Sequence, residues 1–335
     1  MAQCITGAEK QYRSTATRLG FSLLIFYGLF QIYSVIMTAL VPLLTDELSK
    51  TAGTVLYEIL YGVLYAIAFV VPVLFYYLIS KKEWHMPLDA QLILPRETPL
   101  YIFAGIALVR AAGYLNAMLL EVFDYSVFTQ EVIFDTQAST NYELVLMFFT
   151  LAIVPGFVEE LLFRGLILKN LLPYGRTTAV FASALLFGIM HQNPGQFLYA
   201  TVAGLVFGYV YVHTKSLWCC VLMHVCNNFL SVLLTGIGER LPESNATFLV
   251  LAIDLVIFAL GIAGAIYLIL HAKRDPDAVL YEGAFERELT PDVEYAEIPV
   301  PLSRRIRLFF SVPMIIYFAL CAAQMILLLV LSLLF

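Results

Sequence analysis

The chain has 335 residues, of which 61% are hydrophobic and 13% are charged, with a formal net charge of −6. Soluble domains are about half apolar and a quarter charged, so this composition excludes an ordinary water-soluble protein and indicates a membrane protein. The acidic balance excludes a nucleic-acid-binding protein, and an odd count of 5 Cys without metal-ligand spacing excludes a disulfide scaffold.

Nine apolar stretches follow one another along the chain. A bilayer core of about 30 Å needs about 20 apolar residues of helix, and the fifth and sixth stretches are shorter than the others. The first stretch is longer than the ~7–15-residue apolar part of a signal peptide, so we expect it to remain as a span. The sequence predicts an all-α polytopic membrane helix bundle of about eight or nine transmembrane helices, within residues 19–44, 55–79, 99–122, 144–172, 177–191, 197–213, 217–236, 247–271 and 308–335.

The basic residues indicate the orientation, because Lys and Arg concentrate in cytoplasmic loops. Most of the 19 Lys and Arg residues fall in connections on the side of the N-terminus, and Lys50 and Arg240 fall on the other side. Arg110 and Arg164 lie within predicted spans. We therefore expect the N-terminus to be cytoplasmic, and we favour the plasma membrane as the location.

Charged side chains are costly inside a bilayer, so those within spans mark either functional sites or ion pairs. Glu159, Glu160 and Arg164 are the densest such group. Residues four apart share a helix face, which predicts a Glu160–Arg164 pair. Glu159 is rotated by about 100° from Glu160 and lacks that partner, so it is available as a general base. Arg110 is expected to pair with an acid on another helix.

Two histidines and an amide add to this group. His191 lies at the end of the next predicted helix, and His224 and Asn228 lie four residues apart on one face of a later helix. Counted along their helices at ~1.5 Å per residue, Glu159, His191 and His224 all fall near the middle of the membrane. A free carboxylate, two histidines and an amide are a set that can activate water and stabilise an oxyanion.

The motifs Glu159-Glu160-x-x-x-Arg164, Phe187-x-x-x-His191 and His224-x-x-x-Asn228, in this order, resemble the CPBP family of CAAX proteases and bacteriocin-processing enzymes, also called ABI. The family includes the Ras converting enzyme, and the resemblance covers about residues 144–231. It implies an intramembrane endopeptidase. Glu159 with His191 would activate water, His224 with Asn228 would stabilise the oxyanion, and Glu160 and Arg164 would support the site.

With this resemblance the chain divides into three regions. Residues 1–143 hold the N-terminal transmembrane helices and an outer loop. Residues 144–235 form the catalytic helical core, and residues 236–335 hold the C-terminal helices with an acidic cytoplasmic linker at 272–307.

We expect no cofactor, because the chain lacks the His-Glu-x-x-His spacing of zinc peptidases. The alternative is zinc held by Glu159, His191 and His224, since two histidines and a carboxylate from separate helices suffice for such a site.

The expected partners are membrane lipid and a peptide or lipidated protein substrate, and nucleic acid is not expected. Two other functions remain open. One is a non-enzymatic peptide-binding or bacteriocin immunity protein, which would not need both Glu159 and His191. The other is a proton-coupled transporter, which the absence of matched repeats disfavours. The sequence indicates no oligomeric state.

Overall fold

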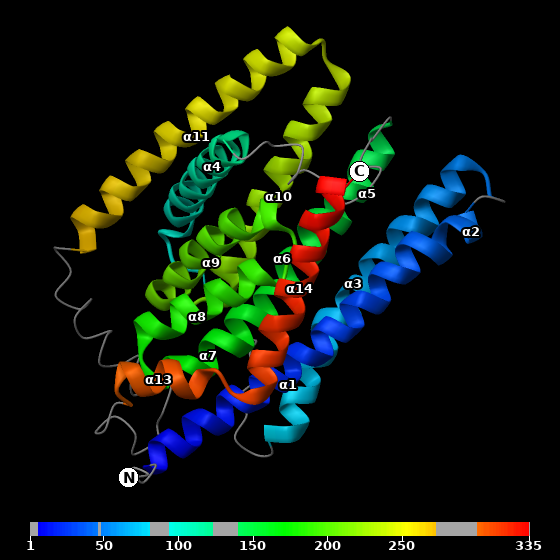
Figure 1. Ribbon diagram of the computed structural model, residues 1–335. Helices are drawn as coiled ribbons and strands as arrows, with labels where there is room; N and C mark the ends of the chain where they lie inside the picture. The colour runs from blue at the N-terminus through cyan, green and yellow to red at the C-terminus, as the bar shows by residue number, and fades with distance from the viewer. Residues whose placement is uncertain (1–5, 46–47, 81–93, 123–139, 273–299, 335) are drawn as a thin grey trace.

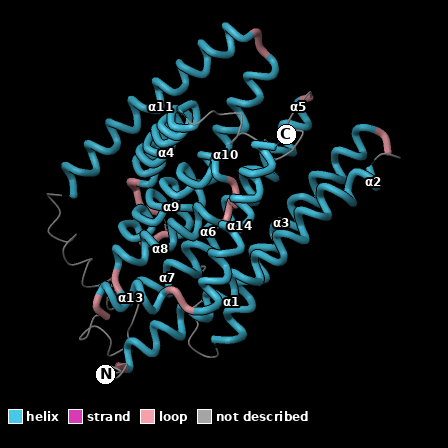
Figure 2. The backbone as a smooth tube through the Cα atoms, in the orientation of Figure 1, coloured by secondary structure: helices cyan, strands magenta, loops and turns pink. Residues whose placement is uncertain are grey.

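The computed structural model describes residues 6–45, 48–80, 94–122, 140–272 and 300–334. Within these ranges every regular element is a helix and no strand occurs (Figure 2). The predicted all-α class is therefore confirmed. Most of the acidic linker predicted at 272–307 and most of the outer loop that ends the first region lie outside the described residues.

Eight of the described helical stretches are long and apolar enough to cross a membrane. The first combines α1 (Gly7–Val35), η1 (Ile36–Leu40) and α2 (Val41–Thr45), and the fourth runs through the elements from 141 to 174. The others are α3 (Lys50–Ser80), α4 (Thr98–Val122), α9 (Pro194–Thr214), α10 (Leu217–Arg240), α11 (Glu243–Ala272) and α14 (Val312–Leu334).

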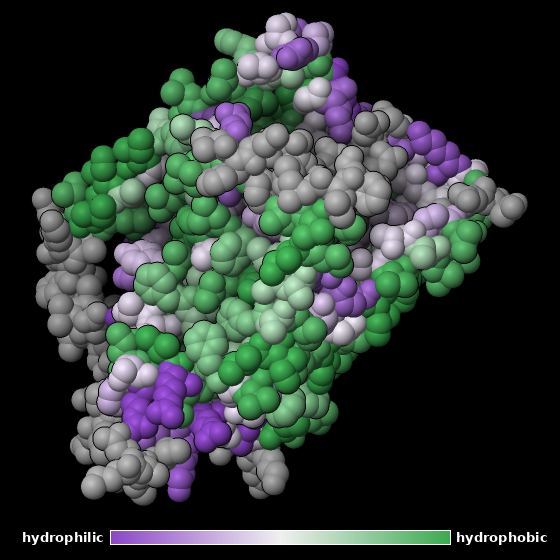
Figure 3. Space-filling model, in the orientation of Figure 1, coloured by the Kyte–Doolittle hydropathy of each residue, from purple (hydrophilic) through white to green (hydrophobic). Residues whose placement is uncertain are grey.

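Two further helices are shorter. α8 (Arg176–Ile189) corresponds to the fifth predicted stretch and ends two residues before His191. α13 (Leu302–Phe309) lies beside the N-terminal part of α1 (Figure 1). Apolar side chains cover most of the face seen in Figure 3, while hydrophilic side chains gather at its lower left. This distribution is that of a multi-pass membrane protein.

The fourth span changes its hydrogen-bond pattern several times. It contains α5 (Asn141–Phe148), the π segment η3 (Phe149–Ile153), α6 (Val154–Glu160), the π segment η4 (Leu161–Leu168), α7 (Lys169–Leu171) and the 3₁₀ turn η5 (Leu172–Tyr174). π segments inside α-helices occur frequently at functional sites. Here they lie on both sides of α6, which carries the two glutamates at its end.

The helices pack in neighbouring pairs. α1 lies against α3 and α14, α4 against α11, and α8 against α9 (Figure 1). The α4–α11 pair is joined by an ion pair in which Arg110 donates to both carboxylate oxygens of Asp254 at 2.9 and 2.6 Å. Tyr114 also donates to Asp254. The expected pairing of Arg110 with an acid on another helix is thus confirmed, and it holds α11 onto the bundle.

Two glycines permit close approach of the helices around the glutamates. A Cβ on Gly204 of α9 would lie 2.8 Å from the Cα of Ala184 in α8. A Cβ on Gly156 of α6 would lie 2.5 Å from a Val225 methyl and 3.2 Å from the Val225 nitrogen in α10. The hydrophobic effect does not hold helices together in lipid, so their association depends on close van der Waals packing, which small residues permit. They bring α6, α8, α9 and α10 together at one level.

This close packing predicts different effects for two glycine-to-alanine changes. Gly204→Ala forces α8 and α9 apart, and we expect a loss of roughly 1–3 kcal/mol in unfolding free energy, as for overpacked cores. Gly28→Ala in α1 has open space around the new methyl group and should be neutral or raise stability by about 0.5–1 kcal/mol. Thermal unfolding in detergent measures both, and equal effects would contradict the role of Gly204.

Candidate functional site

A buried ion pair lies at the centre of the candidate site. Arg164 Nη1 donates to Glu160 Oε1 at 2.8 Å, and both side chains have 0% exposure. His224 on α10 donates from Nδ1 to the same oxygen, also at 2.8 Å. The predicted Glu160–Arg164 pair is therefore present, and it joins a third predicted residue. One carboxylate oxygen ties the fourth span to α10.

The Arg164 guanidinium is enclosed by α8 and α9. Its Nη2 donates to the carbonyl oxygen of Gly204 at 3.0 Å. Its central carbon lies 4.7 Å from the ring centre of Phe187 and 5.2 Å from that of Phe207. Cation–π contacts of this kind strengthen when water is excluded. Gly204 thus takes part both in the close contact with α8 and in the hydrogen bond to Arg164.

Glu159 has a different environment from its neighbour. The hydroxyl of Tyr65 on α3 donates to Glu159 Oε1 at 2.6 Å. Glu159 Oε2 is buried and has no hydrogen-bond partner among the described residues. The carboxylate is only 4% exposed. One oxygen is therefore held in place, and the other is available to a substrate or a water molecule.

His191 follows α8 in a turn, and its hydrogen bond fixes its tautomer. Nδ1 lies 2.9 Å from the carbonyl oxygen of Phe187. A carbonyl only accepts, so the ring proton is on Nδ1 and the lone pair of the neutral ring is on Nε2. Glu159 and His224 are close enough to act on His191 electrostatically. The ring of Phe187 contacts both histidines, at 5.3 and 5.9 Å between ring centres.

Asn228 lies one helical turn beyond His224 on α10. Pro155 has no backbone N–H, so the carbonyl of Leu151, four residues earlier, lacks its usual helical donor. Asn228 Nδ2 donates to that carbonyl at 3.1 Å, and Asn227 donates to Asn228 Oδ1 at 3.2 Å. An amide nitrogen carries two hydrogens. The second one remains for another acceptor.

Sequence reasoning missed two residues of α1 and α3 that reach the site. Tyr65 is one of them. The other is Gln31, which donates from Nε2 to Gln192 Oε1 at 2.7 Å. Gln192 follows His191, has a left-handed backbone with φ of 53°, and is 5% exposed. The only sequence signal was the regular spacing of Tyr57, Tyr61 and Tyr65, which places these tyrosines on one face of α3.

The site residues do not form a ready metal cluster in the part of the chain that the structure describes. No group of three or more His, Cys, Asp or Glu side chains there is arranged to hold a metal ion. Glu159, His191 and His224 would be the ligands of the zinc alternative. His191 and His224 would each have only Nε2 to offer, because Nδ1 of each is engaged.

Comparison with known proteins shows similarity over one segment of the chain. Residues 141–230 match the family described as Type II CAAX prenyl endopeptidase Rce1-like. This stretch contains all six predicted site residues. A protein of Bacillus subtilis (strain 168), YdiL, whose name assigns it to the membrane peptidases, is 33% identical over 92 residues. That match covers 27% of this chain and 37% of the relative. No solved structure matches.

These matches confirm the resemblance to the CPBP family over this segment. Glu159, Glu160, Arg164, His191 and the His224–Asn228 pair lie within the matched residues. The helices before residue 141 and after residue 230 lie outside them.

The enclosed ion pair predicts that breaking it is more harmful than replacing it. Arg164→Ala leaves the Glu160 charge buried without its cation, and we expect a loss of about 3–5 kcal/mol in unfolding free energy. The double change Glu160→Gln with Arg164→Met removes both charges and should lose clearly less. Thermal unfolding of purified protein in detergent compares them. A double variant as unstable as Arg164→Ala would contradict this account.

Proposed function

We propose that the chain is an intramembrane endopeptidase that cleaves a membrane-associated or lipidated protein or peptide without a metal. The observation that carries this proposal is the pair of groups left available at the site. Glu159 Oε2 has no hydrogen-bond partner among the described residues, and the neutral ring of His191, which interacts electrostatically with Glu159, has its lone pair on Nε2. Both groups accept protons, which is what activation of water requires.

The proposed reaction begins with water between Glu159 and His191. Glu159 takes a proton from this water while the oxygen attacks the carbonyl carbon of the peptide bond. The resulting oxyanion would be stabilised by the second hydrogen of the Asn228 amide and, where the His224 ring already carries a proton on Nε2 before the reaction and keeps it throughout, by that N–H group. The proton then passes to the leaving nitrogen, and the carbon–nitrogen bond breaks. Preorganised donors of this kind each contribute about 10²–10³ in rate.

Glu160 and Arg164 would act through His224. Glu160 accepts a hydrogen bond from the Nδ1–H group of His224. This bond fixes the ring so that Nε2 is directed away from the ion pair, as carboxylates do for functional histidines. The Glu160 and Arg164 charges balance, so a proton on His224 would add net positive charge where the oxyanion develops. We further propose that the N-terminus is cytoplasmic, from the distribution of basic residues. We also favour the plasma membrane as the location.

The test is cleavage of quenched peptides, with and without a lipid anchor, by purified protein in detergent. Glu159→Gln should lower kcat/KM by at least about 10²–10⁴-fold, because it removes the general base. Glu58→Gln is the matched control, since Glu58 is another glutamate within the membrane helices and binds the Thr150 hydroxyl at 2.5 Å. It should retain activity.

Each reaction is repeated with a strong zinc chelator. Unchanged cleavage supports the metal-free mechanism, whereas loss that zinc restores would establish the zinc alternative. Full activity of Glu159→Gln would contradict the proposed mechanism. Peptide binding without cleavage, equal in wild type and Glu159→Gln, would favour the peptide-binding or immunity function.

Tyr65 is expected to position Glu159 rather than to bind substrate. Tyr65→Phe frees Glu159 Oε1, and we expect kcat to fall roughly ten-fold, about the effect of one neutral-to-charged hydrogen bond, with KM little changed. Tyr76→Phe is the control because Tyr76, also on α3, donates to Asn170 of α7 at 3.0 Å, far from the glutamates. Equal losses in kcat from both variants would indicate a general packing effect.

A further inference from the structure

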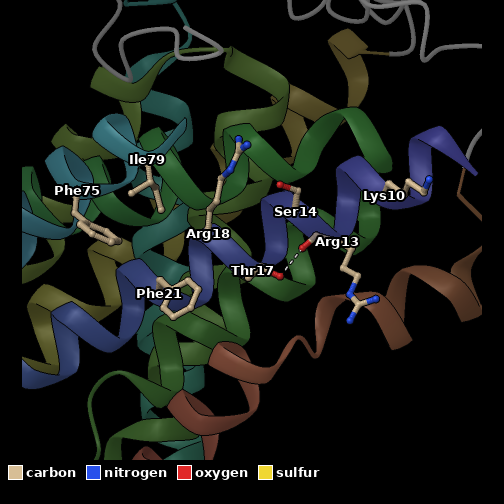
Figure 4. A pocket seen from close by; sticks show the side chains of 8 residues that line it. All are labelled: Lys10, Arg13, Ser14, Thr17, Arg18, Phe21, Phe75 and Ile79. Carbon is tan, nitrogen blue, oxygen red and sulfur yellow. Dashed lines mark hydrogen bonds between the residues drawn. The ribbon is translucent and has the colours of Figure 1, made fainter. Parts of the chain in front are cut away.

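A hollow of about 730 Å³ lies between α1 and the last turns of α3 (Figure 4). Sites for small molecules have volumes of roughly 300–1,000 Å³. None of the residues that line the hollow takes part in the hydrogen bonds around Glu159 and Glu160. The hollow is therefore separate from the candidate active site.

The lining of this hollow changes from polar to apolar along α1. Lys10 and Arg13 lie at one end, Ser14 and Thr17 follow, and Phe21 lies at the other end (Figure 4). Phe21 is 48% exposed. Arg18 lies between Thr17 and Phe21 in the sequence. Apart from Arg18, the order of cations, hydroxyls and an aromatic ring matches the order of phosphate, glycerol and acyl chain in a phospholipid.

The α3 side of the hollow continues the apolar end. Phase and spacing place Phe75 and Ile79 on one face of α3, four residues apart. In Figure 4 both reach toward Phe21 and Arg18 of α1. Long basic side chains such as that of Arg18 lay their stems along apolar surface and keep the charged group at the interface. The two helices therefore provide an open apolar surface with basic side chains beside it.

Among the described residues, the lining of the hollow contains no carboxylate beside Lys10 and Arg13. Glu9 is the nearest acidic residue in the sequence, and its side chain is engaged elsewhere. Its Oε2 accepts from the Thr6 nitrogen at 2.9 Å, and its Oε1 lies 3.5 Å from Arg304 of α13. Lys10 and Arg13 therefore give the described lining at this end of the hollow a positive charge, which favours an anionic ligand.

The length of the hollow indicates how it lies relative to a bilayer. The eleven steps from Lys10 to Phe21 extend about 16 Å along α1 at ~1.5 Å per residue. A headgroup layer is only about 5–8 Å thick on each side of the hydrocarbon. A row that is basic at one end and aromatic at the other therefore passes from the headgroup layer into the acyl region.

We propose that this hollow binds one anionic phospholipid of the surrounding bilayer. The phosphate lies beside Lys10 and Arg13, and an acyl chain lies against Phe21, Phe75 and Ile79. Basic pockets between transmembrane helices bind anionic headgroups in this manner. The site goes beyond the proposed peptidase activity and does not depend on it.

The test is native mass spectrometry of the full chain in detergent with phosphatidylglycerol or phosphatidylcholine of identical acyl chains. Wild type should retain phosphatidylglycerol in preference to phosphatidylcholine. Arg13→Gln should weaken retention of phosphatidylglycerol about five-fold, and Lys10→Gln with Arg13→Gln about 25-fold, since each cation near a headgroup contributes about 1 kcal/mol. Arg307→Gln removes an equal charge from an exposed arginine of α13 that does not line the hollow and should have no effect.

Two further measurements distinguish binding of a whole lipid from binding of a free phosphate group. Phe75→Ala should weaken phosphatidylglycerol retention because it shortens the apolar wall. The deacylated headgroup glycerophosphoglycerol should not displace the lipid. The proposal is overturned if both lipids bind equally, if Arg307→Gln weakens binding as much as Arg13→Gln, or if the soluble headgroup competes as well as the lipid.

Discussion

The Glu160–Arg164 pair is the constraint on which the rest of the site depends. Two charges without solvent exposure are tolerated only where their partners are arranged closely, because each pays a large desolvation cost. Here the partners come from three other helices: His224 from α10, the Gly204 carbonyl from α9 and the Phe187 ring from α8. The hydrogen bonds and the ring contact that surround this one ion pair therefore bring these helices to one level of the bundle. The glycines that permit this approach belong to the same constraint.

A consequence is that the two adjacent glutamates have different hydrogen-bond partners. Glu160 shares one oxygen between an arginine and a histidine, and it is fixed by both. Glu159 accepts a hydrogen bond from Tyr65, and its other oxygen has no hydrogen-bond partner among the described residues. Neighbouring positions on one helix therefore hold a carboxylate fixed by an ion pair and a carboxylate with one oxygen unbonded. In the proposed mechanism the first supports the site and the second acts as the base.

The sequence predicted this division because it follows from local spacing. The interval between Glu160 and Arg164 indicated their pairing, and the rotation of Glu159 indicated its freedom. The spans were also predictable from hydropathy, although the fifth became the 14-residue α8 and His191 lies in the turn after it. Tyr65 and Gln31 could not be found in this way. They lie 94 and 161 residues from their partners, and no local pattern encodes a contact over such a distance. The π segments were missed as well, since hydropathy does not report hydrogen-bond register.

The two contacts that sequence reasoning missed show how the outer helices join the core. Residues 141–230 contain every predicted site residue. Two hydrogen bonds to this segment nevertheless come from α1 and α3, which lie outside it. Gln192 holds a left-handed backbone that a non-glycine residue adopts at a cost of about 1–3 kcal/mol, so surrounding contacts must hold it. The bond from Gln31 on α1 is such a contact, and Gln192 directly follows His191. The N-terminal part of the same helix, from Lys10 to Phe21, lines the basic hollow. A lipid bound there would contact the same helix whose Gln31 binds the turn of His191.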